Sequence, residues 1–137
     1  MRFPSERDQR LAVTVIAQMI SLIESVLLRM QSVQSEADLS ATESGRLLLD
    51  AVCMQYLALG EAVKQLDKLT GLTLQEQVPD QDWKGIMGFR DVLAHQYFNI
   101  DPRQVLWITR EALPAPLQNL RQIQGSCEAV EKRQSAG

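Results

Sequence analysis

The sequence has 137 residues, of which 45% are hydrophobic and 23% charged, and its formal net charge is −3. Length and composition indicate a single soluble domain over residues 1–137, with a tail that frays from about residue 130. The acidic balance argues against nucleic-acid binding that depends on phosphate neutralisation alone. Two cysteines lie far apart and there is one histidine, so a zinc site is close to excluded and we expect neither a metal nor a cofactor.

Nothing in the sequence indicates secretion or membrane insertion. The N-terminal segment lacks the apolar core of a signal peptide, and no uncharged apolar run reaches the roughly 18 residues that a membrane span needs. Cys53 and Cys127 lie in apolar or helical contexts that favour buried, reduced thiols. We therefore expect a cytoplasmic protein.

The first predicted element is a long amphipathic helix. Apolar residues recur at spacings of three and four from Leu11 to Met30, which places them on one stripe. Ser5, followed three residues later by Asp8, is a plausible start for this helix because its hydroxyl can satisfy a free backbone N–H. The polar residues 31–39 are typical of a loop.

A second long helix follows the sequence Ser40–Glu43, which has the pattern of a capping box. Its apolar positions spread around more than one face, so we expect this helix at the centre of a bundle. Gly71 is the residue type that commonly ends such a helix, because it adopts the left-handed conformation without strain.

Three shorter helices are expected in the rest of the chain. One covers about Trp83–Ala94, after an irregular segment, with Asp80 or Asp82 as its cap. Another begins at Asp101, which precedes a proline. Pro114 and Pro116 interrupt the pattern before a last helical segment. With no period-two alternation anywhere, the fold class is all-α, a bundle of four or five helices.

The segment of residues 85–98 carries the most informative side chains. It holds the only histidine, His95, five residues after Arg90 and two before Tyr97. An imidazole exchanges protons near neutrality, and a guanidinium binds phosphate oxygens with a planar set of donors. Five positions separate two side chains by about 140° on a regular helix. Either the helix ends before His95, or another surface completes the site, and a two-fold dimer would supply it.

Simpler roles for the same residues remain open. Asp91 lies four residues before His95, so the two form a surface pair or the aspartate orients a reactive imidazole. Glu61 stands in an otherwise apolar turn and would pair with Arg90 if it faces inward. Gly85 and Gly88 are costly inside a helix, which indicates close packing by a neighbouring helix, a second protomer or a ligand.

The pattern Arg90-x4-His95-x-Tyr97 strongly resembles the motif of the HepT toxins, a branch of the HEPN helical ribonucleases. The resemblance extends over roughly residues 45–120. It includes the segments Asp50–Val52, Leu59–Ala62, Pro79, Trp83–Ile86, Phe98–Asp101 and Glu111–Pro114, in the family's order.

The resemblance implies a homodimeric, metal-independent endoribonuclease with Arg90 and His95 as its catalytic pair. It also implies an MntA-like nucleotidyltransferase antitoxin that AMPylates Tyr97. Asp91 departs from the family, which often has asparagine there, and adds negative charge near the cleft. Two alternatives are a non-catalytic helical partner or substrate of a nucleotidyltransferase, and a purely structural helical dimer.

Overall fold

The computed structural model describes residues 1–96 and 99–136, and this part of the chain contains helices and no strand. The elements are α1 (Glu6–Arg29), α2 (Ala37–Ser40), α3 (Glu43–Leu69), α4 (Leu74–Gln77), α5 (Trp83–Gln96), α6 (Pro102–Trp107), the π-helical segment η2 (Ile108–Ala112) and α7 (Pro114–Ala136). The all-α prediction is confirmed. The additional elements, α2 and α4, are single turns inside segments expected to be irregular.

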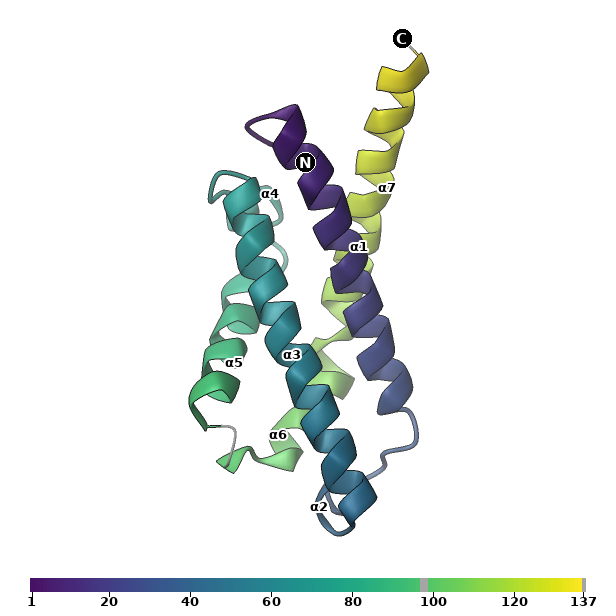
Figure 1. The fold of residues 1–137 in the computed structure, drawn as a ribbon, viewed down its shortest axis with the longest axis vertical. Coiled ribbons are helices and arrows are strands. Elements are labelled where there is room, and N and C mark those ends of the chain that lie inside the picture. The colour runs from purple at the N-terminus through teal and green to yellow at the C-terminus, as the bar shows by residue number, and fades with distance from the viewer. Residues whose placement is uncertain (97–98, 137) are drawn as a thin grey trace.

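The long helices form an antiparallel bundle with α3 in the middle (Figure 1). One side of α3 packs on α1 and the other on α5, while α7 packs on α1. The chain runs along α1, returns along α3, turns back along α5 and returns again along α7, so both termini lie at the same end. The central position expected for the second long helix is therefore confirmed, and it brings residues of α5 directly onto α3.

The helix starts agree with the sequence at one position and differ at another. Ser5 caps α1, since its hydroxyl accepts a hydrogen bond from the backbone N–H of Asp8 at 3.1 Å. The start of α3 is at Thr42, whose hydroxyl accepts from Gly45 N–H at 3.0 Å. Ser40 was the wrong choice, because it closes α2 and its own hydroxyl donates to the Glu36 carbonyl.

Helix α5 is longer than predicted at its C-terminal end. Asp82 is its cap, since the carboxylate accepts from Gly85 N–H at 2.9 Å, and the helix continues to Gln96 rather than ending at Ala94. Asp101 caps α6 as expected. The interruption before Pro114 is the π-helical segment, and α7 then stays helical beyond residue 130, where we expected a frayed tail.

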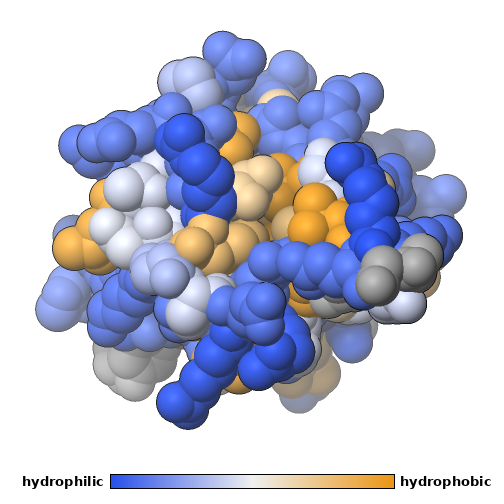
Figure 2. Space-filling model, turned by 90° about the horizontal axis from the view of Figure 1, so that it is seen from above, coloured by the Kyte–Doolittle hydropathy of each residue, from blue (hydrophilic) through white to orange (hydrophobic). Residues whose placement is uncertain are grey.

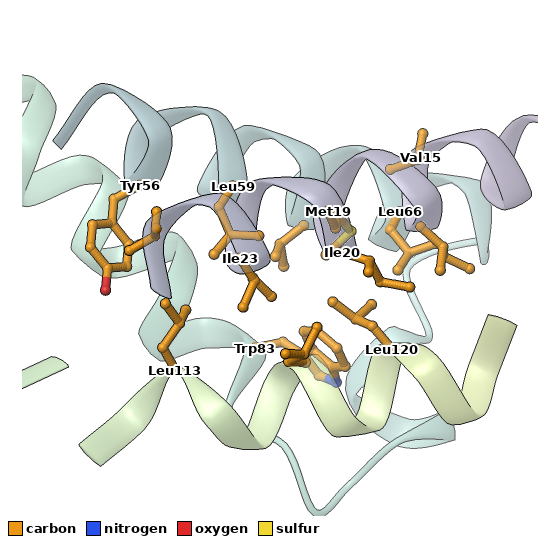
Figure 3. Close-up of a cluster of buried hydrophobic side chains, with 14 of the residues drawn as sticks. Val15, Met19, Ile20, Ile23, Tyr56, Leu59, Leu66, Trp83, Leu113 and Leu120 are labelled. Carbon is orange, nitrogen blue, oxygen red and sulfur yellow. The ribbon is translucent and has the colours of Figure 1, made fainter. Parts of the chain in front are cut away.

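Apolar side chains of α1, α3 and α7 meet around the indole of Trp83 from α5 (Figure 3). Trp83 is 1% exposed and its indole N–H donates to the Val78 carbonyl, so its polar atom is satisfied inside the core. Each large apolar side chain buried in this way stabilises the fold by about 1.5–3 kcal/mol. The fully buried members include Ile16, Met19, Ile23, Leu39, Val52, Val63, Leu66, Leu74, Leu93 and Leu120.

The two cysteines are part of the buried core, and no disulfide joins them. Burial raises the pKa of the Cys53 thiol to about 11, and the nearby Asp50 carboxylate acts in the same direction. The thiol is therefore neutral near pH 7, in agreement with the predicted buried, reduced state.

Tyr56 ties α3 to both α5 and the π-helical segment. Thr109 donates its hydroxyl hydrogen to the Val105 carbonyl at 2.8 Å, so the Tyr56 hydroxyl is the donor in its 2.6 Å bond to Thr109. The rings of Tyr56 and Phe89 form a T-shaped contact with centroids 5.3 Å apart. Burial raises the pKa of Tyr56 well above its ordinary value. These contacts fix the rotation of α5 one residue before Arg90.

Among the described residues, α1 is the one helix long and apolar enough to span a membrane by length and composition. Core helices of soluble proteins share this property. Here the apolar stripe of α1, from Ala12 to Val26, is buried in the bundle. At the end of the molecule that carries both termini, the surface is mostly hydrophilic, with apolar residues near its middle (Figure 2).

Candidate functional site

Arg90 projects from α5 onto the middle of α3, at Gly60. A Cβ atom added to Gly60 would lie 2.8 Å from Cγ of Arg90 and closer still to its Cβ. Real Cβ atoms essentially never approach other atoms so closely. The arginine stem therefore occupies the space that any other residue at position 60 would fill, and glycine is required there.

Two carboxylates hold the Arg90 guanidinium. Its Nε forms an ion pair with Glu61, and one terminal nitrogen lies 3.2 Å from Oδ1 of Asp91. Glu61 pairs with Arg90, but not from the inward-facing position on which the sequence made that pairing depend. Its side chain is 54% exposed, and the arginine reaches out across α3 to meet it.

Lys64, one turn beyond Glu61 on α3, completes a group of four charges. Its ammonium lies 3.2 Å from the same Asp91 oxygen that contacts Arg90. The hydrogen bond from Lys64, and then that from Arg90, lowers the pKa of Asp91 below its usual value. We call Arg90, Lys64, Glu61 and Asp91 the charge cluster. Its two cations and two anions balance, so the cluster attracts an incoming phosphate less than an unpaired arginine and lysine would.

His95 lies in the last turn of α5 and is exposed. Within the described part of the chain it makes no hydrogen bond or ion pair, and Asp91 is held by Lys64 and Arg90 instead. The simple Asp91–His95 surface pair is therefore not formed.

The continuation of α5 to Gln96 decides how Arg90 and His95 lie within one chain. Because the segment is regular helix, the two side chains point in directions about 140° apart. The alternative in which the helix ends before His95 is thus excluded. Tyr97 lies outside the described residues.

The cost of glycine in a helix led us to expect close packing by a neighbour at both glycines of α5, and the structure shows a different environment at each. A side chain at Gly85 would meet the Asp82 carboxylate, with its Cγ at 2.9 Å, so this glycine accommodates the cap of its own helix. A Cβ at Gly88 would have nothing within 4 Å. Among the described residues no neighbouring helix packs there, and they leave open the face of α5 that carries Gly88 and the exposed Val92.

Two residues of this site were not found from the sequence, namely Gly60 and Lys64. The available signal was the i, i+3 spacing of Glu61 and Lys64 on one helix face, with Gly60 beside them. Using that signal required the register of α3 against α5. Among the described residues, no group of three or more histidine, cysteine or carboxylate side chains gathers in a way that suits a metal ion.

Comparison with known protein families matches residues 16–123 to the family described as ribonuclease HepT-like. The match covers most of the chain, including the charge cluster and His95, so the chain belongs to the HepT-like family. The resemblance inferred from the motif is confirmed, and the family is one of RNase toxins of the HEPN type. Such toxins act within toxin–antitoxin systems, with RNA as substrate and an antitoxin as partner. No solved structure matches the chain.

Proposed function

We propose that the protein is a metal-independent endoribonuclease toxin that cuts RNA at a site shared by two copies of the chain. The observation that carries this proposal is the regular helix of α5 through Gln96. It points Arg90 and His95 in different directions, so one chain alone does not bring them together. The open face at Gly88 offers room for the second copy on the same helix. Two copies related by a two-fold axis would contribute two arginines and two histidines to one cleft.

The chemistry follows from RNA's own nucleophile. His95 takes the proton of the 2′-hydroxyl, and the 2′-oxygen attacks the adjacent phosphorus. Arg90 binds the phosphorane oxygens, which carry more negative charge in the transition state than in the substrate. The bond to the 5′-oxygen breaks, that oxygen takes the proton back from the His95 imidazolium, and a 2′,3′-cyclic phosphate is released.

The proposed regulation acts through Tyr97 and a cytoplasmic MntA-like nucleotidyltransferase antitoxin. Transfer of AMP to the tyrosine hydroxyl would place a phosphate two residues from His95 in the sequence. That negative charge and bulk would exclude the RNA backbone from the cleft.

The first test is cleavage of single-stranded RNA by the purified protein in the presence of EDTA. We expect cleavage to persist, to leave 2′,3′-cyclic phosphate ends, and to spare DNA of the same sequence because DNA lacks the 2′-hydroxyl. Cleavage that stops on chelation, or that also cuts DNA, would contradict the proposal. Growth arrest on expression, relieved by the antitoxin, is the corresponding result in cells.

A second prediction concerns the carboxylate that sets this chain apart from its family. Asp91→Asn removes one of the two anions that neutralise Arg90, while the amide still accepts a hydrogen bond from Lys64. We expect RNA to bind about threefold more tightly, because phosphate then competes with one carboxylate fewer. Fluorescence anisotropy with labelled RNA measures the change. Weaker binding would mean that Asp91 helps to hold Arg90 in its active position.

The alternative function is a non-catalytic partner or substrate of the nucleotidyltransferase. The observation that favours it is the full neutralisation of Arg90 and Lys64 by Glu61 and Asp91. In that case the purified protein cuts no RNA under any condition, and nucleotide transfer to Tyr97 still occurs in the His95→Ala variant.

A further inference from the structure

A long groove runs between α1 and α3, next to the charge cluster. It has a volume of about 1150 Å³ and is lined by α1 from Val13 to Leu22 and by α3 from Gln55 to Lys68. The two helices lie antiparallel along this length (Figure 1). The α3 wall spans fourteen residues of helix, or about 20 Å, so the groove is long enough for an extended chain segment.

The charges in this groove are unusual for an acidic protein. The α1 wall is uncharged and consists of Val13, Thr14, Ala17, Gln18, Ser21 and Leu22. The α3 wall carries Lys64 and Lys68 with Glu61 as its one acid. Glu61 is paired with Arg90 and Lys64 with Asp91. Lys68 is exposed and forms no ion pair with another described residue. The groove therefore has a net positive charge in a chain whose total is −3.

The groove is continuous with the candidate site. Glu61 and Lys64 line the groove and also contact Arg90 and Asp91 in the charge cluster. Lys68 lies one turn further along the same face of α3. A polyanion bound at Arg90 thus meets Lys64 and then Lys68 as it passes into the groove.

From this arrangement we infer that the groove between α1 and α3 binds the RNA backbone next to the scissile phosphate, with Lys64 and Lys68 contacting successive phosphates. This inference rests on the proposed ribonuclease function. No aromatic side chain is among the described residues that line the groove, so bases are not held by stacking. Binding there should be independent of sequence and should weaken with salt.

Lys68 is the residue to test, because unlike Lys64 it touches nothing in the charge cluster. The experiment measures binding of single-stranded RNAs of increasing length to a His95→Ala background, which does not degrade them. We expect Lys68→Gln to weaken binding about threefold for the longer RNAs and to leave the shortest unaffected. The slope of log affinity against log salt should fall by about 0.7. Lys132→Gln, an exposed lysine of α7, is the matched control.

The possible results distinguish a failure of the groove assignment from a failure of the proposed ribonuclease function. Equal binding by Lys68→Gln and the control, or a loss that is the same at every RNA length, would overturn the groove assignment while leaving cleavage intact. Unchanged RNA binding with loss of the antitoxin complex would also overturn it, since the groove would then hold a protein helix. The remaining outcome is that Lys68→Gln weakens binding of the longer RNAs as expected, but the wild-type protein cuts no RNA. That result would overturn the proposed function and leave the groove assignment standing.

Discussion

Replacing His95 by alanine is expected to lower the rate of RNA cleavage by a factor of about 10²–10⁴, the contribution typical of a general acid or base. The side chain is exposed and makes no hydrogen bond or ion pair with another described residue, so its loss should not disturb the fold. The measurement is the initial rate of cleavage of labelled RNA. Gln96→Ala, an exposed neighbour on the same helix, is the matched control and should keep full activity.

A mixture of two inactive variants tests whether the site is shared. We expect Arg90→Ala to be as inactive as His95→Ala. Dimers formed from one copy of each variant retain an intact arginine and an intact histidine on opposite copies. If the catalytic pair is formed across the two-fold axis, coexpression of the two variants should restore part of the activity. Mixed dimers that remain inactive would contradict the shared site, even if each variant alone behaves as predicted.

Gly60→Ala is expected to destabilise the protein by about 1–3 kcal/mol and to impair cleavage as well. The added methyl group would occupy the space of the Arg90 stem, so α5 must move away from α3 or the arginine must change its conformation. Either response separates the guanidinium from Glu61. Urea unfolding gives the change in stability, and the cleavage rate of the folded variant gives the effect on the site.

The matched control for that change is Gly125→Ala in α7. A Cβ at Gly125 meets nothing within 4 Å, and alanine favours a helix over glycine by about 1 kcal/mol. This variant should therefore be as stable as the wild type or more so, with unchanged cleavage. If Gly60→Ala and Gly125→Ala have the same stability and activity, the close approach of α5 to α3 at Arg90 is not present in solution.

The sequence predicted those features that depend on neighbouring residues. Ser5 and Asp101 cap helices because the hydroxyl or carboxylate and its N–H partner are only two or three residues apart. The choice between Ser40 and Thr42 failed because both hydroxyls were available locally, and the turn of α2 occupied the first. No local rule indicates that a polar segment forms one extra turn.

In the candidate site, too, some residues could be identified from their sequence neighbours and others only from the packing of α3 on α5. Arg90, His95 and Asp91 are close in sequence, and the motif identified them together. Glu61 was found because a charge within an apolar turn needs a partner. Gly60 and Lys64 depend on which residues of α3 face α5, and this register is set by packing around Trp83 and by the contact of Tyr56 with Phe89.

The placement of both chain ends at one end of the bundle has a practical consequence for work on this protein (Figure 1). Helix α5 finishes toward the other end, so an affinity tag or a fluorophore attached to either terminus stays away from the imidazole. Two differently tagged populations can therefore be captured in sequence, which isolates mixed dimers from parental ones before any rate is measured.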